Sequence, residues 1–186
     1  MQVAVSLVMA DPSTLARLRE GVSAWNTWRN GVELAEVDLR GADLRGADLR
    51  GADLWYALLQ GARLEGALLS GAVLDRADLG HADLANAVLY RCRLRGALLD
   101  GARLRGASFV EADLTLAKVT EADITGAVFT GAVLQGTNFY GSDVDDAHGF
   151  PDSKPWVTEA EGAPKRVAHE GIDRRTIGRV GVEPAR

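Results

Sequence analysis

The feature that most constrains this chain is a five-residue repeat. From residue 32 to residue 146 an apolar residue returns at every fifth position, from Leu34 to Val144, which makes twenty-three pentads without an insertion. The clearest copies read Ala-Asp-Leu-x-Gly, as in residues 42–46 and 47–51. An α-helix turns by about 100° per residue, so a five-residue step would scatter these apolar side chains around its circumference. The repeat therefore excludes one long amphipathic helix.

An extended segment accounts for the repeat better, because residues two apart in it point to the same side. The central apolar residue and the small residue two before it, usually Ala, then face inward, and the residue between them faces outward. Two corner residues complete each pentad. Thirteen pentads have Gly at the second corner position, where a tight turn can need a positive φ. Since Arg76, Asn86 and Glu111 hold that position elsewhere, we expect corners of more than one geometry.

Composition narrows the class of protein. The 186 residues carry a formal net charge of -5, which argues against general affinity for nucleic acid or for a membrane surface. The only cysteine, Cys92, occupies an inward position that suits a small inert thiol, and a chain without an internal disulfide fits a reducing cytoplasm. The first ten residues have neither the positive start of a signal peptide nor the length of a membrane anchor, so we predict neither.

The segment before the repeat predicts a capping helix. Asp11-Pro12 is a typical helix start, and Asn30-Gly31 a typical end. Apolar residues recur between them at helical spacing, at Leu15, Leu18, Val22 and Trp25. We expect one amphipathic helix whose apolar face covers the first coil of the repeat; a partner-binding helix is the alternative.

The segment after Asp146 has the composition of a tail. It holds four of the five prolines, few apolar residues and charges of both signs. We expect Phe150 and Trp156 to fold back over the last coil, and the chain beyond about residue 164 to be extended.

The pentads are similar to the consensus A(D/N)LxX of the pentapeptide repeat family over residues 32–146, and residues 21–29 resemble the helices that lead into such repeats. The resemblance implies an all-β fold, a right-handed quadrilateral β-helix with four pentads, or twenty residues, per coil. The expected organisation is an N-terminal segment with an α-helical cap (1–31), the pentapeptide-repeat β-helix (32–147) and a C-terminal cap with an irregular tail (148–186).

With four pentads per coil, outward residues twenty apart become stacked neighbours. One side then carries alternating charges, a candidate charge ladder that holds register through cross-strand ion pairs: Asp43, Arg63, Asp83, Arg103 and Asp123. The consecutive carboxylates of residues 38, 43, 48 and 53 fall on four different sides. We therefore expect neither a shared metal site nor an acid–base pair from them.

Another side lacks charge in its outward positions after Asp48. An uncharged flat surface of this kind is typical of a contact site, and a plain solvated surface is the alternative. The candidate protein interface consists of Leu68, Val88, Tyr90, Val110 and Val128.

No sequence motif predicts catalysis. His81, His148 and His169 lack metal-ligand spacing, and no phosphate loop or nucleophile elbow is present. We therefore expect no enzymatic activity and no cofactor. The chain's basic cluster is read first as ion-pair partners and second as an anion site: Arg91, Arg93, Arg95, Arg103 and Arg105.

The favoured function is a non-enzymatic scaffold that binds another protein, or itself as a homodimer, through a flat side. The alternative, implied by the family, is a DNA mimic that binds DNA gyrase, a type II topoisomerase, and protects it from inhibitors, as in antibiotic resistance. Overall acidity favours the mimic, whereas Arg63 and Arg103 interrupt its negative stripe. Neither function involves direct contact with nucleic acid or a membrane.

Overall fold

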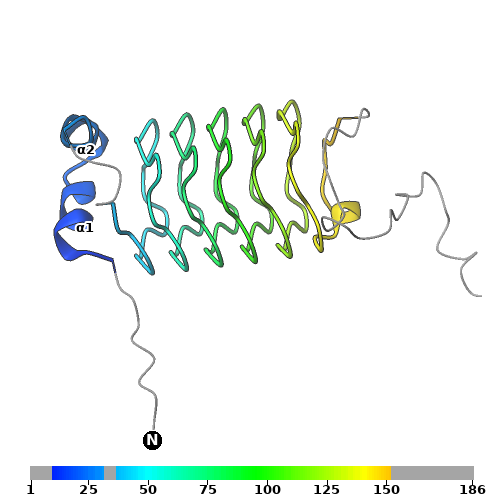
Figure 1. Ribbon diagram of the computed structural model, residues 1–186, viewed down its shortest axis with the longest axis horizontal. Helices are drawn as coiled ribbons and strands as arrows, with labels where there is room; N and C mark the ends of the chain where they lie inside the picture. Colours follow the sequence, from blue (N-terminus) through cyan, green and yellow to red (C-terminus); the bar gives the residue numbers. More distant parts are fainter. Residues whose placement is uncertain (1–9, 32–36, 152–186) are drawn as a thin grey trace, which may run out of the picture.

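The protein is a rod of stacked coils, described by a computed structural model for residues 10–31 and 37–151. Two helices, α1 (Pro12–Arg19) and α2 (Val22–Arg29), cover one end, and the 3-10 helix η2 (Val144–Asp146) lies at the other (Figure 1). The first pentad, residues 32–36, lies outside the described residues, as do Trp156 and the expected tail.

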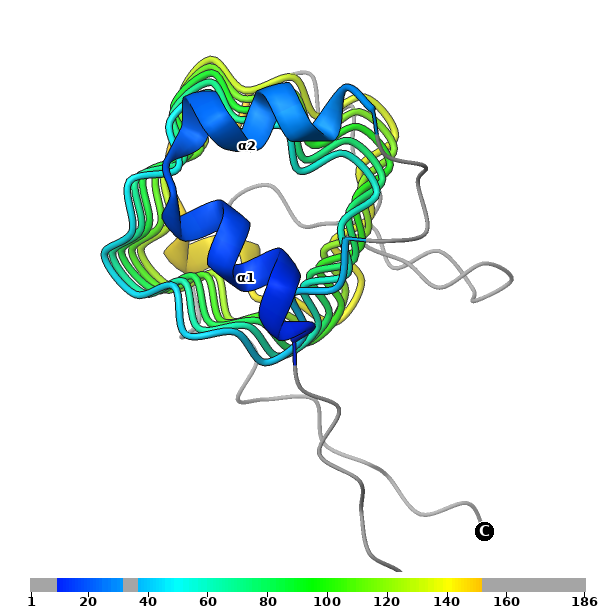
Figure 2. The ribbon, with the colours of Figure 1, turned by 90° about the vertical axis from the view of Figure 1, so that its left-hand side faces the viewer.

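Backbone hydrogen bonds fix a register of twenty residues per coil. Parallel bridges join outward residues twenty apart, such as Asp43 with Arg63 and Arg63 with Asp83. The backbone N–H of Leu58 donates to the carbonyl oxygen of Val37 at 2.9 Å, and its own carbonyl accepts from Leu39 at 2.8 Å. This register confirms four pentads per coil, and Figure 2 shows the four-sided outline along the axis. The bridges are single-residue because a corner follows every triplet.

Each of the four sides is named here by its outward residues. The ladder side carries Asp43, Arg63, Asp83, Arg103 and Asp123, and the chain then turns onto the uncharged side, with Asp48, Leu68, Val88, Ser108, Val128 and His148. The arginine side follows with Asp53, Val73, Arg93, Asp113 and Val133, and the fourth side has Asp38, Leu58, Asp78, Leu98, Lys118 and Asn138. The ladder side is therefore opposite the arginine side.

The corners share one geometry, so the expectation of several corner types is wrong. In each two-residue corner from Gly41 to Gly141 the second residue has a positive φ. This residue is Gly or one of eight other residues with φ of 52–59°. Except at Ala122, the next N–H donates back across the corner, as from Ala42 to the carbonyl oxygen of Leu39 at 3.1 Å. With a positive φ at the third of four residues but not at the second, and with that closing bond, the corner is a type II turn. The backbone ladder imposes this turn even on Arg76 and Leu116, despite a left-handed penalty of about 1–2 kcal/mol.

Corner side chains explain where glycine is required. The imidazole of His81 lies over Gly101, where an added Cβ would approach its Nδ1 to 2.5 Å. By contrast, an added Cβ at Gly61 would meet nothing within 4 Å. Six of the eight non-glycine corner residues are followed by Gly twenty residues later. The two exceptions make specific contacts instead: Arg76 lies over the ring of Tyr56, and Arg91 pairs with Glu111 at 2.6 Å.

The core is a set of inward columns. Central Leu and inward Ala residues are almost completely buried in every regular coil, and each large central side chain contributes roughly 1.5–3 kcal/mol. Near the C-terminal end the column becomes aromatic: Phe109 and Phe129 stack with ring centroids 5.0 Å apart. Phe150 packs on Phe129 and Phe139, so it covers the last coil as expected.

The N-terminal cap consists of two helices and not of one. Asp11 caps α1 by accepting the N–H of Thr14 at 2.7 Å, and Glu20 is the C-cap that follows the last helical residue, Arg19. Gly21 then takes φ 106° and ψ 159°, which breaks the helical path and lets α2 start in a new direction. Figure 2 shows α2 along one side of the outline and α1 across its opening. Leu18 and Trp25 are buried in the core cluster that the coils form.

Side chains of α2 replace the backbone of a preceding coil. Asn26 accepts the N–H of Asp53 at 2.8 Å, and the indole N–H of Trp25 donates to the Asp53 carbonyl oxygen at 2.8 Å. Arg29, itself buried, donates to the carbonyl oxygen of Trp55 at 2.7 Å. These are the groups that pair with a neighbouring coil elsewhere in the rod, so α2 closes a sheet edge that would otherwise be open.

The last pentad departs from the regular geometry. No bridge joins Asp123 to Asp143 within the described coils, and η2 occupies the corner where Asp146 lacks a positive φ. The hydroxyl of Ser142 replaces a corner bond of the preceding coil, because it accepts the N–H of Ala122 at 2.9 Å and donates to the carbonyl oxygen of Val119 at 2.7 Å. Pairing resumes at His148, which bridges Val128.

The frequent Asp of the repeat has a local function that the sequence analysis missed. From the outward position its carboxylate accepts the N–H of the first corner residue, as Asp123 does from Thr125 at 3.1 Å. Asn138 makes the same bond to Tyr140 at 2.8 Å. In the first coil the side chain of the corner arginine also binds this carboxylate: Arg45 donates to Asp43 through Nε at 2.8 Å and through Nη2 at 2.7 Å.

We predict that Gly101→Ala destabilises the rod more than Gly61→Ala. Both positions have similar φ values of 63° and 65°, so the backbone strain is shared. Only the methyl group of Gly101→Ala displaces His81, and this displacement lowers the unfolding free energy by a further amount on the order of 1 kcal/mol. Chemical denaturation of the two variants measures the difference. The His81→Gly/Gly101→Ala double variant should remove it, and equal losses for the two single variants would contradict the stacking.

We predict that acid destabilises the first coil through its Asp–Arg pairs. The hydrogen bonds from Arg45 and Arg50 lower the pKa values of Asp43 and Asp48 to about 2. Unfolded, these carboxyls titrate near about 3.9, so the unfolded state binds more protons below about pH 4. The stabilisation is therefore complete above about pH 4 and is lost as the pH falls towards about 2.

Thermal unfolding between about pH 5 and about pH 2 tests this coupling. The Asp43→Asn/Asp48→Asn variant keeps the corner bond, as Asn138 does, but has no carboxylates at these positions to protonate. Its Tm should depend less on pH than that of the parent, and parallel curves would refute the assignment.

Candidate functional site

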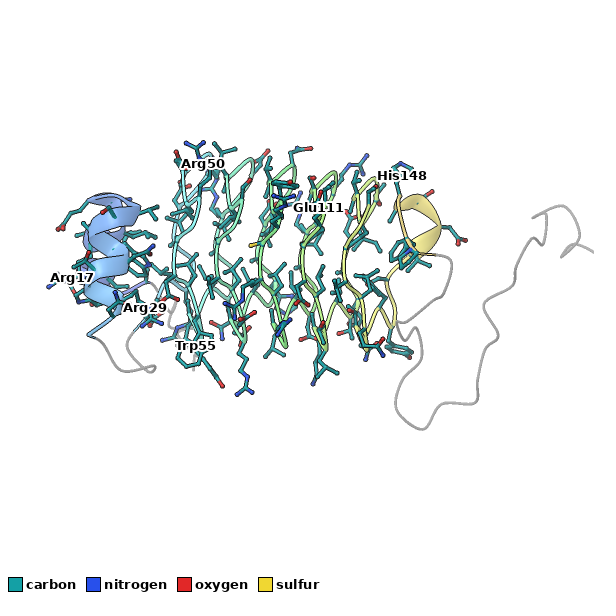
Figure 3. The ribbon with its side chains drawn as sticks, turned by 90° about the horizontal axis from the view of Figure 1, so that it is seen from above. Arg17, Arg29, Arg50, Trp55, Glu111 and His148 are labelled. Atoms are coloured by element: carbon teal, nitrogen blue, oxygen red, sulfur yellow. The ribbon has the colours of Figure 1, made fainter. Side chains whose placement is uncertain are left out.

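The candidate interface lies on the uncharged side as one continuous column. Leu68 bridges Val88, Val88 bridges Ser108, and Ser108 bridges Val128. Leu68 is 36% exposed, and Val88, Val110 and Val128 are half-buried. Asp48, paired with Arg50, and His148 mark the two ends of the column. In Figure 3 the labelled Arg50, Glu111 and His148 follow the same edge of the rod.

Tyr90 and Val110 lie at the corner between the uncharged side and the arginine side. The guanidinium of Arg91 lies 4.8 Å from the Tyr90 ring centroid, and its Nε donates to Glu111 at 2.6 Å. The corner is thus held by an aromatic contact and an ion pair.

The ladder residues are stacked in register but pair in two separate sets. Arg63 reaches Asp43 at 3.4 Å, and Arg103 reaches Asp83 at 3.1 Å. Asp123, in the next coil, accepts from Thr125 instead, and these hydrogen bonds lower its pKa. The ladder side is therefore ion-paired from Asp43 to Arg103, whereas its carboxylate at Asp123 is held by hydrogen bonds.

Carboxylates without a basic partner gather at the C-terminal end. From residue 111 to residue 148 the chain has seven acidic residues and one Lys, whereas residues 37–110 have nine acidic and ten basic residues. Between residues 111 and 148, five exposed carboxylates of the ladder side and its corners make no salt bridge: Glu121, Asp123, Asp143, Asp145 and Asp146.

The structure divides the basic cluster predicted from the sequence. Arg103 and Arg105 lie on the ladder side and its corner, whereas Arg93 and Arg95 lie on the opposite arginine side and its corner. Arg95 donates to Asp113 at 2.5 Å, and this hydrogen bond raises its pKa. Arg93 pairs with the nearly buried Asp75.

The sequence analysis did not select the most exposed apolar residues. Three of the five large exposed ones lie on the arginine side or its corner to the fourth side: Trp55 at 38%, Leu116 at 67% and Val133 at 48%. An open cleft of about 600 Å³ lies where α2 meets this side. Its lining includes Trp55, Val73 and Arg93. Sorting the corner residues by side, as was done for the outward residues, would have found this group.

Chemically reactive groups are dispersed. Burial raises the pKa of Cys92 to about 12, and its thiol donates to the carbonyl oxygen of Ala72 at 3.1 Å, so no thiolate forms at neutral pH. Across residues 10–31 and 37–151, no three His, Cys, Asp or Glu side chains are grouped to hold a metal ion. The helices in these ranges are too short and too polar to cross a bilayer.

Comparison with solved structures returns pentapeptide repeat proteins. One from Nostoc Pcc 7120 is 22% identical, covers 81% of this chain and 97% of its own, and has a TM-score of 0.48. One from the Arabidopsis thaliana thylakoid lumen is 27% identical over 66% of this chain and 77% of its own, with a TM-score of 0.33. QnrB1, a plasmid-mediated fluoroquinolone resistance protein, is 21% identical over 57% and 64%, with a TM-score of 0.34.

The family model for pentapeptide repeats matches residues 25–55, 56–89, 87–126 and 112–148. No curated protein sequence matches the chain. A right-handed quadrilateral β-helix is the fold that this match implies, in agreement with the four-sided coils. The matched repeats cover well over half of the sequence, and the chain therefore belongs to the pentapeptide repeat family.

Proposed function

We propose that this protein is a non-enzymatic scaffold, acting in the cytoplasm, that binds another protein or a second copy of itself through the uncharged side. The observation that carries the proposal is the uncharged column from Leu68 to Val128, four outward positions in successive coils. Flat apolar surfaces on soluble proteins are typical contact sites. The separation and pairing of the carboxylates support a binding role over catalysis.

The size of the side limits the partner's footprint. Coils repeat at about 4.8 Å, so a rod of nearly six coils offers one side of roughly 25–30 Å by 10 Å. That flat area of about 300 Å² is below the roughly 800 Å² that each partner buries in a standard interface. The partner must therefore contact the corners as well, where Tyr90 and Val110 lie.

We predict that Val88→Glu weakens partner binding or self-association by at least about tenfold, because a charge would be buried at the centre of the column. Pull-down from cell extract and sedimentation of the purified protein measure the two cases. Leu98→Glu is the matched control, since Leu98 is a half-buried outward residue bridged on both sides in the opposite, fourth side. Retention of every partner and of the oligomeric state by Val88→Glu would refute the interface.

A second candidate function, the DNA mimic that binds gyrase, is favoured by the unpaired carboxylates at the C-terminal end. These five negative charges are spread over two coils, which span about 10 Å of the rod axis, so the rod carries one charge per roughly 2 Å there. Duplex DNA carries one per about 1.7 Å. The match in charge density covers only this end, because arginines pair with the carboxylates of the first coil.

We predict that, if the mimic is correct, the protein changes supercoiling by purified gyrase or its sensitivity to a quinolone. Asp123→Asn/Asp143→Asn/Asp145→Asn should abolish the effect, because it removes three of the five charges. The control is Asp38→Asn/Asp43→Asn/Asp48→Asn, which removes three arginine-paired carboxylates. Unchanged supercoiling and inhibitor sensitivity with the parent protein would exclude this function.

A further inference from the structure

The arginine side and its corner to the fourth side carry a surface that neither proposed function uses. We call it the arginine–aromatic face and define it as Trp55, Tyr56, Arg76, Arg93 and Arg95. The residues come from three successive coils, because Asp75 and Arg95 follow Trp55 at twenty-residue steps along one corner. In Figure 3 the labelled Trp55 lies beside Arg29 near the helical end.

The ion pairs of this face point their positive partner outward. Arg93 is 57% exposed and its partner Asp75 only 9%; Arg95 is 62% exposed and its partner Asp113 only 19%. In the first coil, by contrast, Arg45 and Asp43 are exposed to 48% and 45%. The two pairs are formally neutral, yet solvent meets the guanidinium groups, and the carboxylates lie beneath them.

The two carboxylates also accept hydrogen bonds from other donors. Asp75 accepts from Arg93 and from the backbone N–H of Arg95 at 2.9 Å. Asp113 accepts from the N–H and the hydroxyl of Thr115 and from Arg95. A guanidinium carries five N–H donors. The described contacts use one donor each in Arg76, Arg93 and Arg95, so most of the donors remain directed at solvent.

Aromatic rings complete the face. Trp55 and Tyr56 meet edge to face at 4.7 Å, and the Arg76 guanidinium lies 5.4 Å from the Tyr56 ring centroid. Trp55 and Arg93 also line the cleft beside α2, together with the amides of Asn26 and Asn30. Trp, Tyr and Arg are the residues most enriched where interfaces carry their binding energy.

We propose that the arginine–aromatic face binds an extended acidic segment of a partner protein, with carboxylates on the three arginines and an apolar side chain against Trp55. Three coils span about 10 Å, which three or four extended residues cover at about 3.3 Å each. A short acidic peptide fits this length. A duplex would extend past the face towards coils whose net charge is negative, so nucleic acid is disfavoured.

A selection from short random peptides displayed on phage, with the full-length protein immobilised, reads the ligand chemistry directly. We expect the selected peptides to be enriched in Asp and Glu. A synthetic labelled peptide from the selection should bind Arg76→Gln/Arg93→Gln/Arg95→Gln at least about tenfold more weakly than the parent, by fluorescence anisotropy. Its affinity should also fall as salt rises, because the pairs are exposed.

Two further variants make the result specific. Trp55→Ala/Arg76→Gln leaves the pairs with Asp75 and Asp113 intact, so it should still fold and should still weaken binding. Arg45→Gln/Arg50→Gln/Arg63→Gln removes equal charge from other sides and should leave the affinity within about twofold. Peptides without acidic enrichment, or equal affinity for the parent and both face variants, would overturn the proposal. Equal competition by a DNA duplex would overturn it as well. Val88→Glu leaves this face unchanged, so failure of the uncharged-side interface and failure of this site are distinguishable.

Discussion

The structure depends on the backbone ladder between coils. Each outward residue donates one hydrogen bond to the coil before it and accepts another from it, so every regular coil from residue 37 onward is fixed to its neighbour at twenty-residue intervals. The bonds need a corner after every three extended residues. The ladder therefore selects the type II turn, and the turn sets the five-residue period. Burial of Leu and Ala columns supplies much of the favourable free energy, while the ladder decides which residues share a side.

Much of the fold can be predicted from sequence because the five-residue period leaves few solutions. Inward and outward positions follow from alternation, as the burial of Leu54 and Ala52 shows. The break at Gly21 was not predictable from helical spacing, since Val22 and Trp25 continue the apolar pattern of α1. The uniform corners were missed for a related reason: local preference disfavours a positive φ at Leu116, and the ladder on either side overrides it.

The surfaces were less predictable, because exposure depends on both partners of a contact. Sorting outward residues by side located the ladder side and the uncharged side. It did not show that Asp75, a corner residue, is buried beneath Arg93, or that Arg76 lies over the ring of Tyr56. The rod thus presents an uncharged column, an arginine–aromatic face and an acidic end on different parts of one domain. The contacts proposed above therefore use different surfaces.

The overlap of His81 with Gly101 has a consequence for how such a rod lengthens. In six of eight cases a bulky corner residue lies over the corner of the following coil, where a permissive glycine stands twenty residues later in the chain. A duplicated coil must then satisfy two different junctions, one at each end. An all-glycine corner can be inserted after any coil, whereas a coil with a large corner residue needs a following corner that either leaves room for it or pairs with it, as Glu111 does with Arg91. Growth by duplication is therefore directional, and corner residues twenty apart are expected to change together among related rods.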